Sequence, residues 1–173
     1  MKTIKKKREN NTNKVAEINI AGIRETEYSI SEPSSSELEE IKGLPISISV
    51  LINLGWTIEK DQFGIFFYFE FLHPKIEGKV FCKIRIVNEF IIKNIKDHLH
   101  ISEEDKTKFN MDDGLLKFLI EIAINQSRGF LACRFRGSFL SHILLPLASQ
   151  EDFLNQLQKL VITKSLPTTN SPA

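Results

Sequence analysis

The sequence predicts an α+β fold, in which a four-stranded antiparallel sheet is followed by a long helix, an apolar crossover loop and a C-terminal helix. Apolar residues alternate strictly along residues 46–58, which is typical of a half-buried strand. Residues 63–72 are rich in β-forming residues and carry aromatic side chains on both faces. From Asp112 onward the apolar spacing changes to three and four residues, which indicates a helix. A chain of 173 residues has the length of one domain.

The strands follow in order along the first half of the chain. Residues 15–30 alternate weakly and predict a first strand, and residues 31–36 read as a loop. Residues 73–78 contain proline and glycine and predict a hairpin turn. The strand 80–87 follows, and Asn88-Glu89 breaks its phase, so we expect a bulge there before residues 90–92. One face of the third strand carries Phe63, Ile65, Phe67, Phe69 and Phe71, and the opposite face carries Phe66 and Tyr68.

The second half of the chain is predicted to be helical. Asp112 and Asp113 can cap a helix, and Gly137 is a plausible stop after Arg136. The loop 138–146 is apolar, and a last amphipathic helix is expected from about Ser149. The core-facing stripe of the long helix should contain Leu115, Leu116, Leu119, Ile122, Ala123 and Gln126.

Charge and composition narrow the function classes. The formal net charge is +1, so binding of nucleic acid through the whole surface is disfavoured. Residues 1–14 hold six of the basic groups and one acid, and we expect a basic flexible arm there, a single domain over 15–162 and a disordered tail over 163–173. The alternative is that this arm binds RNA or an acidic client. Phe accounts for 13 residues, and so many must serve a core, an interface or a groove.

No enzyme signature is present in the sequence. Gly-x-Ser-x-Gly and the phosphate-binding glycine motifs do not occur, so we expect neither an enzyme nor a cofactor. His98 and His100 could hold a metal on a strand, but an exposed loop is the interpretation we favour. Cys82 and Cys133 have no Cys-x-x-Cys spacing, and we expect two reduced, buried residues. With no signal-peptide apolar run and no membrane span, we expect a cytoplasmic protein.

The segment Arg136-Gly137-Ser138-Phe139-Leu140-Ser141-His142-Ile143-Leu144-Leu145-Pro146 resembles the Arg-Gly-Thr-Phe-Pro-x-Leu-x-Leu-x-Pro segment of the SecB export chaperone family. In that family the segment also lies between a long and a short helix. The strand Val80-Phe81-Cys82-Lys83-Ile84 is similar to the family's Phe-Leu-Cys-Glu-Val. The resemblance covers roughly residues 15–160. Leu140 replaces the family's first loop proline, and Gln126-Ser127-Arg128-Gly129 replaces its Tyr-Ala-Arg-Glu.

The resemblance implies a homotetramer, built as a dimer of dimers with helices in the middle, that holds unfolded chains in apolar grooves without ATP. In the family an acidic residue on the outer sheet face helps to dock the basic tail of the SecA motor. This position corresponds to Lys83, next to Phe81, and a lysine would repel a basic partner, so coupling to SecA is doubtful. The candidate client-binding residues are Trp56, Phe66, Tyr68, Phe139, Ile143 and Leu145.

Two alternatives to a general chaperone for unfolded or exported chains stay open. As some solitary SecB-like proteins are, the chain could be a dedicated chaperone of a toxin–antitoxin partner, which neighbouring genes would reveal. It could also be a non-chaperone interaction module that uses its Phe-rich face only to form oligomers.

Overall fold

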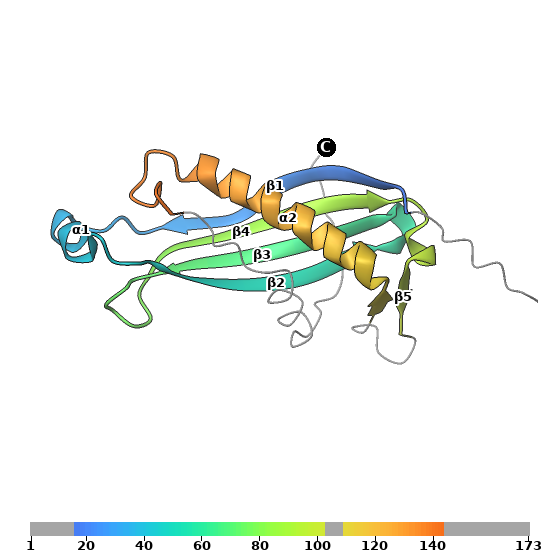
Figure 1. Ribbon diagram of the computed structural model, residues 1–173, viewed down its shortest axis with the longest axis horizontal. Helices are drawn as coiled ribbons and strands as arrows, with labels where there is room; N and C mark the ends of the chain where they lie inside the picture. The colour runs from blue at the N-terminus through green and yellow to red at the C-terminus, as the bar shows by residue number, and fades with distance from the viewer. Residues whose placement is uncertain (1–15, 103–108, 144–173) are drawn as a thin grey trace, which may run out of the picture.

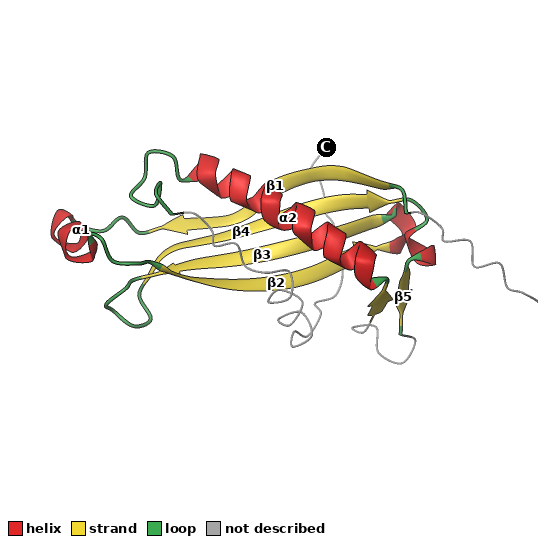
Figure 2. Cartoon of the chain, in the orientation of Figure 1, coloured by secondary structure: helices red, strands yellow, loops and turns green. Residues whose placement is uncertain are grey.

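The computed structural model describes residues 16–102 and 109–143, which form a curved antiparallel sheet crossed on one face by a long helix (Figures 1 and 2). The strand order is β1-β4-β3-β2. α1 lies at one end of this sheet, and a second, two-stranded sheet of β5 and β6 lies at the other end (Figure 1). The elements are β1 Ile18–Ile30, α1 Ser35–Ile41, β2 Ser47–Thr57, η1 Ile58–Lys60, β3 Gln62–Leu72, β4 Val80–Ile92, η2 Ile95–Asp97, β5 Leu99–Ile101, β6 Phe109–Met111 and α2 Asp113–Arg134.

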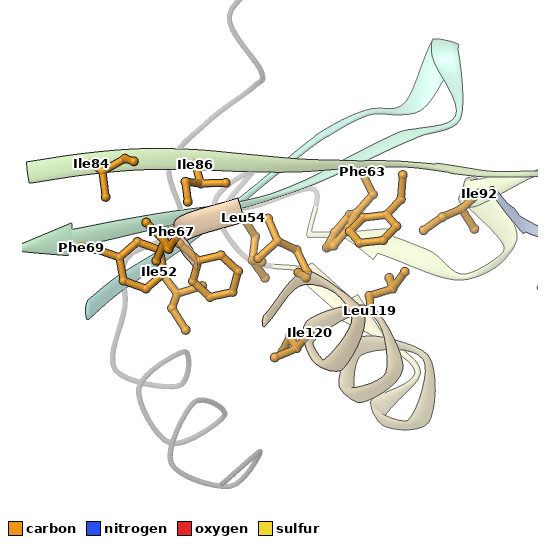
Figure 3. Close-up of a cluster of buried hydrophobic side chains, with 14 of the residues drawn as sticks. Ile52, Leu54, Phe63, Phe67, Phe69, Ile84, Ile86, Ile92, Leu119 and Ile120 are labelled. Atoms are coloured by element: carbon orange, nitrogen blue, oxygen red, sulfur yellow. The ribbon is translucent and has the colours of Figure 1, made fainter. Parts of the chain in front are cut away.

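The core lies between α2 and one face of the four-stranded sheet. The register places Ile52 of β2 opposite Phe67 of β3, and Phe67 opposite Ile86 of β4. Alternate residues of the three strands therefore share one apolar face, as the period-two pattern predicted. Figure 3 shows Leu119 and Ile120 of α2 directed toward this face. The aromatic set predicted for the helix side of β3 is buried there, namely Phe63, Phe67, Phe69 and Phe71 with Ile65.

β4 corrects the prediction of a bulge at Asn88-Glu89. The strand pairs with β3 through both residues without a shift, so Asn88 stays in phase on the core face. Its amide Nδ2 donates to Ser127 Oγ of α2 at 3.0 Å, which gives this buried side chain one hydrogen bond in an otherwise apolar layer. Asn88 and Glu89 interrupt the apolar pattern of the sequence because they are polar, but the backbone of β4 continues through them without a bulge. The register shifts on the other side of β4 lie in β1, near Ala21 and Thr26.

The helices agree only in part with the sequence prediction. α2 begins after Asp112, whose carboxylate accepts from the Leu115 N–H at 2.9 Å, and it runs through Gly129 as expected. It ends at Arg134, two residues before the predicted limit. α1 was missed, because residues 31–36 read as a loop. Ser34 and Glu37 form a capping box at its start, and this Ser-x-x-Glu spacing was the available signal.

The second, small sheet and one of the two cysteines differ from the sequence prediction. The small β5–β6 sheet was not anticipated, and His100 lies exposed on its first strand. Cys82 is buried as predicted, whereas Cys133 is exposed because it faces away from the sheet on α2. The basic arm, the C-terminal helix, the tail and Leu145 lie outside the described residues. Within the described ranges, no helix has both the length and the apolar character needed to cross a membrane.

The buried pair of Asn88 and Ser127 gives a stability prediction. Ser127→Ala removes the hydroxyl that accepts from the amide, so a buried polar side chain is left unpaired at a cost of about 1–3 kcal/mol. The higher helix propensity of alanine offsets a few tenths of this. Urea unfolding should show a lower midpoint for Ser127→Ala and partial recovery in Asn88→Leu/Ser127→Ala. An unchanged midpoint in the single variant would contradict the buried bond.

Candidate functional site: an apolar pocket at the crossover loop

The last turn of α2 is fixed to β1 by two contacts of one arginine. Arg134 Nε donates to Glu25 Oε2 at 2.9 Å, and its guanidinium lies 3.8 Å from the centre of the Tyr28 ring. An ion pair combined with a cation–π contact constrains both the position and the plane of the guanidinium. The start of the crossover loop is thereby held over the β1 side of the sheet.

The crossover loop then turns sharply and returns to the core. Gly137 has a φ of +83°, a backbone conformation that glycine adopts without steric cost. The Ser138 hydroxyl donates to the Phe135 carbonyl at 2.8 Å and accepts from the Leu140 N–H at 3.2 Å. Leu140, which stands where the SecB family has proline, is fully buried. A hydroxyl-stabilised turn and a buried leucine therefore fix this loop.

Phe139 is positioned by a row of aromatic rings. Its ring meets that of Phe81 edge-on at a centroid separation of 5.2 Å, and Phe81 lies 4.9 Å from the His73 ring. His73 is buried, and its Nδ1 accepts from the Lys75 and Ile76 N–H groups at 3.1 and 3.0 Å. The proton of the neutral ring must then be on Nε2. Two residues at the β3–β4 hairpin, His73 and Phe81, thus hold Phe139 of the crossover loop in place.

An apolar pocket of about 770 Å³ lies between α1, the first residues of β2 and the crossover loop. This volume is within the usual range of ligand sites, about 300–1,000 Å³. Its polar side chains are Glu39, Lys42 and His142, and Lys42 Nζ pairs with Glu39 Oε1 at 3.2 Å. Its apolar lining comprises Leu38, Ile41, Leu44, Pro45, Ile46, Ile48, Phe139 and Ile143. Such a lining can take up apolar side chains but offers no nucleophile held by a base.

The wall that α1 forms is tied to the β3–β4 hairpin. Glu37 pairs with Lys79, and it also accepts from the Ser34 N–H at 2.9 Å within the capping box. The hydrogen bond from Lys79, together with that from Ser34, lowers the pKa of the Glu37 carboxyl to about 2. Ile41, the last residue of α1, is buried. The Glu37 carboxylate therefore connects the start of α1, which forms a wall of the pocket, to Lys79 of the β3–β4 hairpin.

The structure brings together two of the predicted client-binding residues, Phe139 and Ile143. Trp56 is elsewhere, near the far end of β2, with its ring 5.2 Å from that of Phe109. From Ile48 to Trp56 the strand spans roughly 26 Å at about 3.3 Å per residue. Figure 1 accordingly shows α1 and β5 at opposite ends of the sheet. Within one chain these residues do not line a common pocket.

Phe66 and Tyr68 lie on the opposite face of the sheet, as the alternation predicted. The Arg85 guanidinium covers them, at 4.3 Å from the Tyr68 ring centre and 5.5 Å from that of Phe66. Phe66 is only 7% exposed in the single chain. Leu51, the cross-strand neighbour of Tyr68 on β2, is 44% exposed on the same face. The Arg85 guanidinium therefore covers the two rings, while apolar surface remains exposed beside them.

The two residues of the proposed partner-docking strand differ in exposure. Phe81 is 1% exposed and packs against Phe139, so in this chain it belongs to the core. Lys83 is exposed, and Glu70 accepts a hydrogen bond from its Nζ at 2.9 Å, which raises the pKa of Lys83. Lys83 therefore does not present an isolated positive charge.

Among the described residues, the metal-ligating side chains do not form a second site. In residues 16–102 and 109–143, no three His, Cys, Asp or Glu side chains lie close enough to hold a metal ion. Burial raises the pKa of the Cys82 thiol to about 11, so this thiol is a weak nucleophile at neutral pH. A smaller hollow of about 350 Å³ lies beside β5 and β6, between His100, Ile101, Ser102, Phe109 and Asn110.

Sequence reasoning missed the α1 side of the pocket. Leu38, Ile41 and Leu44 follow one another at three-residue spacing directly after the capping box, and this pattern could have identified an amphipathic turn. That the turn would face the crossover loop, about 100 residues later, required the folded chain. Neither a protein-family model nor a curated protein sequence matches this chain.

The Glu37 carboxylate makes the anchoring of α1 sensitive to acid. Because the folded-state pKa of about 2 lies below the ordinary value of 4.5, the contribution is complete above pH 4.5 and is lost as the pH falls through 2. The stability difference between wild type and Glu37→Gln should therefore shrink over this interval. Urea unfolding at a series of pH values measures it. Glu40→Gln, in the same exposed helix, is the control, and equal behaviour of the two variants would contradict the anchoring role.

Proposed function

We propose that this protein is a cytoplasmic, ATP-independent chaperone of the SecB-like type, a holdase that binds exposed apolar segments of unfolded proteins. The observation that carries the proposal is the apolar pocket closed by Phe139 and Ile143. These residues come from the segment on which the SecB resemblance rests. The order of sheet, long helix and crossover loop supports the same conclusion.

The character of the pocket supports a binding function of low chemical selectivity. Most of its lining is aliphatic or aromatic, and its charged pair Lys42–Glu39 lies on the helix side. Two lining leucines, Leu38 and Leu44, remain partly exposed. Apolar side chains of many shapes can gain free energy there by leaving water, since this gain depends on area and not on direction. A protein that binds many clients needs a surface of this kind.

A homotetramer, with the long helices in the middle, is the assembly we propose. Phe118 of α2 is 50% exposed on the helix face that points away from the sheet. Phe118 lies in the second turn of α2, and we propose that its exposed ring packs against a helix of another subunit. This residue also supports the second candidate function, an oligomeric interaction module that binds no unfolded client.

Coupling to the SecA motor is not part of the proposal. The position that would carry an acidic docking residue holds Lys83, which is already paired with Glu70. A basic partner would have to compete with Lys83 for that carboxylate. A dedicated client, such as the antitoxin of a toxin–antitoxin pair, remains the narrower form of the proposed function.

Holdase activity can be tested with a heat-aggregating model enzyme. Stoichiometric amounts of the protein should reduce its light scattering, and Leu44→Asp at the pocket should weaken the effect about tenfold, because a leucine contact contributes about 1.5–3 kcal/mol. Ile76→Asp is the matched control, since Ile76 is 47% exposed and Leu44 is 39% exposed. No suppression by wild type at about tenfold excess would refute the proposal.

The assembly can be tested by multi-angle light scattering. The measured mass should be about four times the chain mass, as expected for a dimer of dimers. Phe118→Asp should lower the mass, because a carboxylate would be buried in the helix interface without a partner. Circular dichroism controls for folding. A wild-type monomer would contradict the tetramer, and an unchanged mass in the folded variant would place the interface elsewhere.

A further inference from the structure

We propose that the outer edge of β2 pairs strand to strand with the client, which binds as an added β-strand with alternating apolar residues. This inference rests on the proposed holdase function and specifies how the client is held. Its basis is a contrast between the two edges of the four-stranded sheet, together with the position of the pocket along one of them.

The sheet ends on one side with β1 and on the other with β2. β1 carries the usual features that block pairing with other chains, because it has two register shifts against β4 and contains Arg24, Glu25 and Glu27. β2 has none of them. It pairs with β3 over its full length without a shift, and its 11 residues include neither a charged residue nor a proline. Within the described ranges, nothing pairs with its outer edge.

The two faces of β2 determine which strand would fit. On the α2 side it presents Ile48, Val50, Ile52 and Leu54, whereas the other side presents Ser47, Ser49, Leu51 and Asn53. Neighbouring strands place residues of like character on the same face. A strand that pairs with β2 should therefore carry apolar residues at every second position, on the side that faces α2. Segments of unfolded β-proteins expose this pattern.

The edge and the pocket are continuous. Ile46, directly before β2, and Ile48, its second residue, are also part of the pocket lining. Side chains of an added strand that lie beside Ile48 on the α2 side would enter the pocket between Leu44 and Ile143. Backbone hydrogen bonds would then give affinity for any sequence, and the pocket would select apolar residues.

A second copy of β2 is a less suitable occupant. Its α2-side residues already pack in their own subunit, since Ile52 and Leu54 are buried and Trp56 contacts Phe109. A second β2 could supply backbone partners but no side chain for the pocket. An unfolded client supplies both.

Hydrogen exchange of the full chain tests the proposal, with reduced and carboxymethylated α-lactalbumin as a client that cannot refold. Every second amide of an edge strand points outward, so half of the amides of β2 should exchange fast alone and slowly with client. β1, the other edge, is the internal control and should not change. Client binding with unchanged exchange in β2 would overturn the pairing and leave the holdase function intact. Failure to bind client would overturn both.

Protection of all β2 amides before client is added would also overturn the proposal. It would show that the edge is already covered, and dependence of this protection on protein concentration would identify a second copy as the cover.

A pair of proline variants provides an independent test. The amides of Ser49 and Val50 point to opposite edges of β2 because they are adjacent. Proline is tolerated where the lost N–H points away from β3, so one of the variants Ser49→Pro and Val50→Pro should keep its melting temperature. In that variant the proline ring lies on the outer edge of β2, where it blocks the addition of a strand. This variant should bind the client at least about tenfold more weakly, a loss of about 1.4 kcal/mol. Unchanged binding in the folded variant would overturn the proposal, and hydrogen exchange decides if neither variant folds.

Discussion

The packing of α2 on one apolar face of the sheet is the interaction on which the rest of this structure depends. The face is continuous because β2, β3 and β4 are paired so that Ile52, Phe67 and Ile86 lie side by side. A slip of one residue in any strand would turn its whole apolar set to the other side. The Asn88–Ser127 hydrogen bond gives the same layer one directional contact, which fixes where along the sheet the helix lies.

The pocket is a consequence of this packing and has no core of its own. α2 carries the crossover loop to the end of the sheet at which α1 lies, where the contact of Arg134 with β1 and the burial of Leu140 hold the loop. α1 reaches the same place from the other direction and is tied by the Glu37–Lys79 pair. The pocket is therefore built where three separate segments meet, namely α1, the start of β2 and the crossover loop.

The same sheet combines a protected and an unprotected edge. A long, uncharged and regular edge strand promotes unwanted association, and most proteins shorten, charge or bend such strands. β1 follows this rule, whereas β2 does not. In the part of the chain that the structure describes, an unpaired edge lies beside an apolar pocket, an arrangement that fits the proposed binding of extended chains.

The sequence by itself determined the four strands of the large sheet, the start of α2 and the face of β3 that the helix covers, because period-two and period-three-to-four patterns are local. It also pointed to Phe139 and Ile143, through the resemblance of residues 136–146 to a segment of the SecB family. Only the tertiary structure decided that Asn88 continues its strand, that Arg85 covers Phe66 and Tyr68, that Phe81 is core and that α1 completes the pocket. Each of these depends on a partner distant in the sequence, and no local pattern contains that information.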